Sequence, residues 1–233
     1  MPLPRALLLL ATLAFAPLFS RSQTAPLPAN SEETDFAQLH HYRAQNAALP
    51  TAHAKRVVFL GDSITEYWGL HSGTWFAPPQ WLNRGIGGQT TQQLLLRERN
   101  DALDLHPRAI VIEGGGNDMR LGFSPEAIRD NIASIAELAR AHRVTVFIAG
   151  MAPVCDCVRP LTGLRTVERI HRLNALLQQL CREQHWTYLD FNTPLADADG
   201  LMRKELTVDG VHPNTDGYKL LEPVVLEALH DYR

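Results

Sequence analysis

Four separate segments of the sequence contain residues suited to hydrolytic chemistry. They hold Ser63, the pair Gly87-Gly88, Asn117 and, near the C-terminus, Asp209 with His212. A serine hydroxyl is a weak nucleophile until a base takes its proton, and His212 can serve as that base. Asp209, three residues before His212, can fix the tautomer and orientation of the imidazole. Together these residue types predict nucleophilic acyl transfer.

Acyl transfer also requires hydrogen-bond donors for the negative oxygen of a tetrahedral intermediate. A glycine at position 87 or 88 lets a backbone N–H approach that oxygen closely. The side-chain amide of Asn117 and the backbone N–H of Ser63 are two further candidates.

Each segment also has a purely structural interpretation. Ser63 is a residue type that often caps a helix, and the Gly87-Gly88 pair suits a simple turn. Asn117 can cap a local turn, and His212 can support the last helix from a loop. The occurrence of all four segments, in this order and mostly after strands, favours the catalytic interpretation.

Alternating strands and helices must position these segments. Short apolar or β-branched runs predict strands at residues 56–60, 81–86, 109–112, 144–149 and 187–191. Helical spacing and capping residues predict helices at about residues 34–49, 90–99, 124–139, 167–181 and 214–229. We therefore predict an α/β fold with a flavodoxin-like five-stranded parallel sheet, strand order 2-1-3-4-5, and helices on both faces.

The segments also resemble the conserved blocks of a known enzyme family. They read Gly-Asp-Ser-Ile-Thr at 61–65, Asn-Arg-Gly-Ile-Gly-Gly-Gln-Thr-Thr at 83–91, Gly-Gly-Asn-Asp at 115–118 and Asp-Gly-Val-His-Pro-Asn at 209–214. Over roughly residues 55–230 the chain resembles the SGNH (GDSL) hydrolases, and most of all the platelet-activating-factor-acetylhydrolase-like branch. Ile64 replaces the leucine for which the GDSL motif is named.

The resemblance implies a three-layer α/β/α sandwich and a role for each matching residue. Ser63 would be the nucleophile, His212 the base and Asp209 the orienting acid. The Ser63 N–H, Gly88 and Asn117 would stabilise the oxyanion. The family needs no metal and no cofactor.

The substrate is less well defined by the sequence. The resemblance implies a small-molecule or carbohydrate ester, with short acyl esters, acetylated carbohydrates, lysophospholipids and thioesters all open. Asp62, Trp68 and Met119 are candidates for substrate contact, although large apolar residues such as Trp68, Trp75, Trp81 and Met119 usually belong to a core.

The N-terminus differs in character from the rest of the chain. An apolar run from Ala6 to Phe19 follows Arg5, and it is shorter than the roughly 20 residues that span a bilayer. We therefore predict a signal peptide at residues 1–22, a linker at 23–33, a hydrolase domain at 34–233, and export to the periplasm or outside the cell. A membrane anchor is the alternative; after processing, no stable membrane insertion is expected.

Charge and cysteine content constrain the partners and the redox chemistry. The net charge is −3 and no basic stripe is present, so nucleic acid is not an expected partner. The spacing of the cysteines, with His185 nearby, matches no strong zinc pattern. Cys155 and Cys157 would be strained if bonded to each other, and a bond from either one to Cys181 stays open.

Two rival functions come from other classes. A metallophosphoesterase would use Asp62, Asn117, Asp118, Asp209 and His212 as ligands, but too few histidines follow strands for such a site. A non-catalytic carbohydrate-binding module on the same scaffold would not require the Ser, His and Asp set. The sequence leaves the oligomeric state open.

Overall fold

The sheet that organises the molecule contains five parallel strands. The computed structural model describes residues 35–51, 54–70 and 77–233. The strands are β1 (Val57–Gly61), β2 (Trp81–Gly85), β3 (Ala109–Ile112), β4 (Thr145–Ala149) and β5 (Thr187–Leu189). Their order is β2-β1-β3-β4-β5, and every neighbouring pair is parallel. The predicted fold class and strand order are confirmed.

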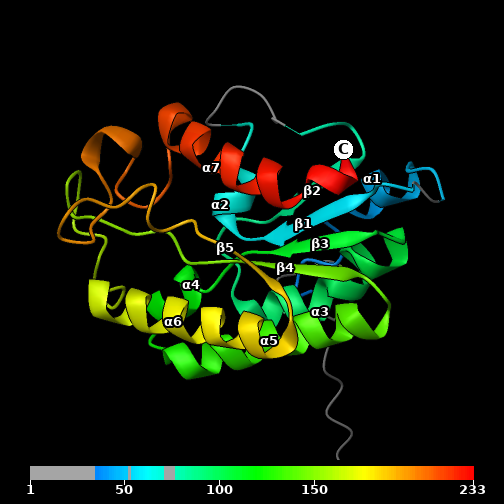
Figure 1. Cartoon of the computed structure of the whole chain (residues 1–233), viewed down its shortest axis with the longest axis horizontal. Helices are drawn as coiled ribbons and strands as arrows, with labels where there is room; N and C mark the ends of the chain where they lie inside the picture. Colours follow the sequence, from blue (N-terminus) through cyan, green and yellow to red (C-terminus); the bar gives the residue numbers. More distant parts are fainter. Residues whose placement is uncertain (1–34, 52–53, 71–76) are drawn as a thin grey trace, which may run out of the picture.

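Helices cover both faces of this sheet. The helices of the described chain are α1 (Arg43–Ala47), α2 (Ser63–Glu66), α3 (Thr91–Asp101), α4 (Gly116–Arg120), α5 (Pro125–Ala141), α6 (Val167–Gln184) and α7 (Thr215–Ala228). Three short 3₁₀ helices occur at Leu103–Leu105, Lys204–Leu206 and His230–Tyr232. Figure 1 shows α3, α5 and α6 on one face and α7 on the other, which makes three layers.

The alternation of side chains along each strand explains the two cores. In β1, Val58 and Leu60 pack in a cluster with residues of α3, α5 and α6. Val57 and Phe59 point the other way and pack in a second cluster with residues of α7. Because both faces of β1 are buried, its sequence reads as an unbroken apolar run, as expected for a central parallel strand.

The predicted N-terminal helix is much shorter than expected. We predicted helix from about residue 34 to 49, whereas α1 covers only Arg43–Ala47. Gln38 has a left-handed backbone (φ 55°), which interrupts a right-handed helix. The Asp35 carboxylate accepts hydrogen bonds from the N–H groups of Leu39 and His40, which fixes a turn here.

Other element boundaries differ by a few residues. β5 ends at Leu189 because the Asp190 carboxylate accepts the N–H groups of Asn192 and Thr193 and turns the chain. The last helix begins close to the predicted position: Asn214 caps α7, and its side chain accepts the N–H groups of residues 216 and 217.

The predicted signal peptide and linker lie outside the described residues, as does Trp75. Among the helices that the structure describes, none is both long and apolar enough to cross a membrane.

A fully buried arginine fastens the end of β1 to its surroundings. The Arg97 side chain donates to the carbonyl oxygen of Gly61 (2.8 Å), to the Gln89 side-chain oxygen (2.6 Å) and to the Asp101 carboxylate (3.3 Å). The Arg97 and Asp101 side chains are 0% and 1% exposed. Since Gly61 directly precedes Asp62 and Ser63, Arg97 fixes the strand end from which the candidate nucleophile projects.

We expect Arg97→Ala to lower the free energy of unfolding by about 3–5 kcal/mol, because it leaves the buried Asp101 charge unpaired. Arg99→Ala, at an exposed position of the same helix, is the matched control and should change it by less than about 0.5 kcal/mol. Urea unfolding followed by circular dichroism measures both. Equal midpoints for the two variants would contradict this role for Arg97.

Candidate active site

Ser63 lies at the point where β1 ends and α2 begins. Asp62 caps α2, and its side chain accepts the N–H of Ile64 at 2.9 Å. This tight change from strand to helix places Ser63 at the carboxyl edge of the sheet, where functional residues of open α/β folds gather. Ser63 is 9% exposed and lines a cavity at that edge.

Ser63, His212 and Asp209 form one chain of contacts. His212 Nε2 lies 2.9 Å from Ser63 Oγ, and His212 Nδ1 lies 3.0 Å from Asp209 Oδ2. A carboxylate can only accept, so Nδ1 carries the proton of the neutral imidazole and Nε2 is left as the acceptor for the Ser63 hydroxyl. The structure therefore brings Ser63 together with the Asp209 and His212 pair, although His212 lies 149 residues further along the chain.

A tight turn holds Asp209 and His212 in this relation. Asp209 Oδ1 accepts the N–H groups of Val211 and His212, both at 3.0 Å. Burial alone would raise the pKa of Asp209, but these two N–H donors and the imidazole outweigh it and lower the pKa to about 2. Asp209 is thus an ionised acceptor at any pH well above that value.

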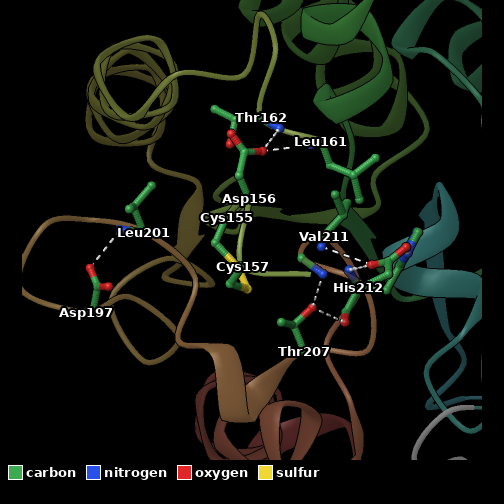
Figure 2. The surroundings of a disulfide bond; sticks show 12 residues. Cys155, Asp156, Cys157, Leu161, Thr162, Asp197, Leu201, Thr207, Val211 and His212 are labelled. Atoms are coloured by element: carbon green, nitrogen blue, oxygen red, sulfur yellow. Dashed lines mark hydrogen bonds and ion pairs between the residues drawn. A yellow bond between two sulfur atoms is a disulfide. The ribbon is translucent and has the colours of Figure 1, made fainter. Parts of the chain in front are cut away.

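The turn is supported from both sides. Thr207 Oγ1 accepts the N–H of Gly210 (2.9 Å) and donates to the carbonyl oxygen of His212 (2.8 Å). Gly210 has φ +99°, and its carbonyl accepts the N–H of Cys155 at 2.8 Å. A Cβ at position 210 would lie 2.3 Å from the carbonyl oxygen of Cys155. Figure 2 shows the Cys155 loop beside the Thr207–His212 turn.

The cysteine pairing differs from the sequence expectation. Cys155 and Cys157 are bonded to each other, with their Cα atoms 5.2 Å apart, and Cys181 is free and buried. The bridge ends two residues before Arg159, a residue that contacts Asp209.

The predicted oxyanion donors occupy different positions relative to the cavity. Asn117 lines the cavity, and its side-chain amide donates to the carbonyl of Gln89 (3.0 Å) and more weakly to Asp62 (3.3 Å). Gly88 has φ +81° and lies outside the cavity lining. The Gly87 N–H donates to Glu66 (2.8 Å), whereas the Gly88 N–H forms no hydrogen bond to another described residue.

The cavity beside Ser63 has a volume of about 190 Å³. Its lining combines apolar and ionisable side chains from the segments that follow β1, β3 and β4 and from the loop before α7. They are Asp62, Ser63, Ile64, Glu113, Gly116, Asn117, Arg120, Met151, Ala152, Pro153, Val154, Arg159, Leu161, Arg165, Asp209, Val211 and His212.

Two buried carboxyl groups lie at the base of this cavity. Burial raises the pKa of Asp62. Burial and the neighbouring Asp62 raise the pKa of Glu113 well above its usual range. Glu113 Oε2 accepts hydrogen bonds from the Thr65 hydroxyl (2.9 Å) and the Asp62 N–H (3.3 Å). Both burial and the neighbouring Asp62 therefore disfavour a negative charge on Glu113.

Of the three expected substrate contacts, only Asp62 lines the cavity. Trp68 is 3% exposed and packs against Phe191 and Tyr218 in the core beneath α7. Met119 is 0% exposed in the core on the opposite face. Their large apolar surfaces stabilise the two cores, so the core interpretation applies to both.

The ligand set of the rival metallophosphoesterase is not assembled. The Asp118 carboxylate accepts the N–H of Thr91 and its hydroxyl (2.5 Å), and Asp118 is fully buried outside the cavity lining. Within the residues that the structure describes, no group of three or more His, Cys, Asp or Glu side chains is arranged to hold a metal ion.

The arginines of the cavity were not among the site residues predicted from the sequence. Arg120 ends α4, and Arg159 and Arg165 lie between β4 and α6. Arg159 donates to Asp209 Oδ2 at 3.3 Å. The sequence does predict a loop after the fourth strand, at the carboxyl edge of the sheet where functional residues gather. That position could have indicated Arg159 and Arg165 as site residues.

Comparison with known proteins places this site in a family. Residues 59–220 match the model of the GDSL-like lipase/acylhydrolase family. The chain belongs to this family. It is accordingly an ester-hydrolysing enzyme with the α/β fold of its structural neighbours.

Individual family members are similar over most of the chain. Platelet-activating factor acetylhydrolase IB subunit alpha1 of Bos taurus is 28% identical over 215 residues, which cover 88% of this chain and 86% of that protein. Esterase TesA of Pseudomonas aeruginosa is 28% identical over 174 residues, 70% of this chain and 81% of that protein. A crystal structure of a GDSL-like lipase from Bacteroides thetaiotaomicron has a TM-score of 0.78 and 31% identity, and the match covers 85% of this chain and all of that one.

The close approach at Gly210 yields a test of the turn. We expect Gly210→Ala to lower ester hydrolysis by about 10²-fold, because displacing the turn from Cys155 shifts His212 relative to Ser63. Gly163→Ala is the matched control: its φ is also positive (+48°), but the position of its Cβ is open. Rates of 4-nitrophenyl acetate hydrolysis measure both, and a wild-type rate for Gly210→Ala would overturn the argument.

Proposed function

We propose that this enzyme is an exported serine esterase in which Ser63, His212 and Asp209 act as a catalytic triad. The observation that carries the proposal is the 2.9 Å contact between Ser63 Oγ and His212 Nε2. An imidazole within hydrogen-bond reach of a hydroxyl that lines a cavity supports the assignment of His212 as the base.

In the first half of the reaction, Ser63 Oγ attacks the ester carbonyl carbon and its proton passes to His212 Nε2. The carbonyl oxygen becomes negative and accepts hydrogen bonds from the N–H groups of Ser63 and Gly88 and from the Asn117 amide. To donate to the oxyanion, the Asn117 amide would exchange its longer hydrogen bond, 3.3 Å to Asp62, for one to the substrate. His212 then protonates the departing alcohol.

In the second half, water attacks the acyl-enzyme and His212 takes the proton of the water molecule. The second tetrahedral intermediate collapses, the acid leaves, and Ser63 Oγ regains its proton. Asp209 stabilises the imidazolium formed in both halves, because its carboxylate stays ionised beside Nδ1.

The size of the cavity favours short acyl groups or other small substituents. Its volume of about 190 Å³ is similar to that of an engineered cavity of about 150 Å³ that binds benzene. The charged arginines of the lining do not suit a long hydrocarbon chain. Acetylated carbohydrates fit this description if the sugar remains outside the cavity.

Export is proposed from the sequence of residues 1–22 alone, whose basic start and short apolar run are typical of signal peptides.

We expect Ser63→Ala to lower 4-nitrophenyl acetate hydrolysis by a factor on the order of 10⁴–10⁶, because no nucleophile remains. Ser134→Ala, at an exposed position of α5, is the control and should keep the wild-type rate. Circular dichroism checks that both variants are folded. A folded Ser63→Ala protein with the wild-type rate would end the triad assignment.

The low pKa of Asp209 predicts the effect of removing its charge. Asp209 is ionised at any pH well above its pKa of about 2, so at neutral pH its carboxylate lies beside the imidazolium that forms during the reaction. Asp209→Asn removes this charge and should lower kcat by about 10⁴-fold. Rates of 4-nitrophenyl acetate hydrolysis at neutral pH measure the loss.

Asp216→Asn removes the same charge from the exposed start of α7 and is the control for this experiment. Its kcat should match that of the wild type. A wild-type kcat for Asp209→Asn would show that Asp209 does not act on His212.

A further inference from the structure

Three guanidinium groups line the cavity that contains Ser63. Arg120, Arg159 and Arg165 come from two different loop regions of the carboxyl edge, and all three border the same space. An esterase acting on neutral esters has no chemical need for such a concentration of positive charge. The carboxylates of the lining decide how much of this charge is already neutralised.

The nearby carboxylates are largely engaged elsewhere. Asp209 contacts both His212 and Arg159. Burial and the neighbouring Asp62 disfavour a negative charge on Glu113. Asp62 is held by the N–H of Ile64 and by the Asn117 amide. Among the described residues, neither Arg120 nor Arg165 forms an ion pair with any carboxylate.

Arg165 is the more informative of the two. It is only 5% exposed, and its guanidinium donates to the carbonyl oxygen of Leu161. Its buried Nε has no hydrogen-bond partner among the described residues. Leaving a charged donor buried and unsatisfied costs free energy, which a bound acceptor would recover.

The two guanidinium groups are close enough to repel each other. Burial lowers the pKa of Arg165, and the charge of Arg120 lowers it further, while more distant carboxylates act in the opposite direction. Arginine still remains charged at neutral pH. An anion placed between the two groups would remove their repulsion and satisfy the free Nε, and arginine pairs well with carboxylate and phosphate oxygens.

We propose that Arg165 and Arg120 form an anion subsite beside Ser63, so that the preferred substrate is an ester that also carries a carboxylate or phosphate group. The inference rests on the proposed function and narrows its substrate class. Arg165 binds the anion from within the cavity and Arg120 from its exposed rim. Arg159, partly neutralised by Asp209, contributes less.

The test compares anionic and neutral esters in matched pairs. For a carboxylate on the leaving group, the pair is 4-acetoxybenzoate and its methyl ester. For a phosphate on the leaving group, the pair is 4-acetoxyphenyl phosphate and 4-nitrophenyl acetate. For a carboxylate on the acyl group, the pair is mono-4-nitrophenyl glutarate and 4-nitrophenyl butyrate. The quantity measured is the ratio of kcat/KM within each pair. Dividing the wild-type ratio by that of a variant cancels differences in intrinsic reactivity.

We expect Arg165→Gln to lower the ratio by at least about 10-fold for one pair, chiefly through KM of the anionic ester. Arg165→Lys should keep part of the preference, and Arg120→Gln should lower it by a smaller factor. Arg172→Gln, at an exposed position of α6 outside the cavity, is the matched control and should leave the ratio unchanged. Added salt should reduce the wild-type preference for the anionic ester, because salt screens the charge at the exposed rim of the cavity.

If Arg165→Gln fails to fold, Arg120→Gln and inhibition of the wild type by inorganic phosphate, with the neutral ester as substrate, decide the question. Ratios that stay at the wild-type value in both Arg165→Gln and Arg120→Gln would overturn the anion subsite. An unchanged ratio for Arg120→Gln together with no inhibition by phosphate would overturn it as well. Failure of the proposed function looks different: Ser63→Ala would then hydrolyse the neutral esters normally.

Discussion

The contact between Ser63 Oγ and His212 Nε2 joins two parts of the chain that are 149 residues apart. It exists only because all five strands run parallel and end at one edge, so that the end of β1 faces the loop before α7. Most of the surrounding hydrogen bonds serve to fix one side of this contact. Arg97 holds the carbonyl of Gly61 on the serine side, and Thr207 and Asp209 hold the turn on the histidine side.

Local chemistry made much of the fold predictable. Unbroken apolar runs such as Val57–Leu60 occur where a strand is buried on both faces, and residues such as Ser124 begin helices by accepting a backbone N–H. The N-terminal helix was mispredicted because the apolar spacing of residues 36–43 continued through Gln38, whose left-handed backbone depends on the Asp35 turn. Such a turn is fixed by individual hydrogen bonds and leaves little trace in periodicity.

The site residues were predictable for a different reason. Ser63, Asn117, Asp209 and His212 each follow a strand or precede a helix at the edge where parallel strands end, so their meeting follows from topology. The arginines of the cavity were not predictable in this way. Arg120 lies at the end of a helix and Arg165 lies in a loop, and many other residues share such positions. Only the folded structure shows that both line the cavity beside Ser63. The bond between Cys155 and Cys157 likewise depends on the path of a loop.

The charges around Ser63 also constrain one another. Asp209 must stay ionised to orient His212, and two backbone N–H groups and the imidazole make this possible. A second full negative charge at Glu113 would sit beside Asp62 in a buried space, and this repulsion, together with burial, raises the pKa of Glu113. Asp62, Asp156 and Asp209 attract the Arg165 guanidinium, but none of them forms an ion pair with it. A buried guanidinium whose Nε has no hydrogen-bond partner among the described residues is suited to a negatively charged group of the substrate.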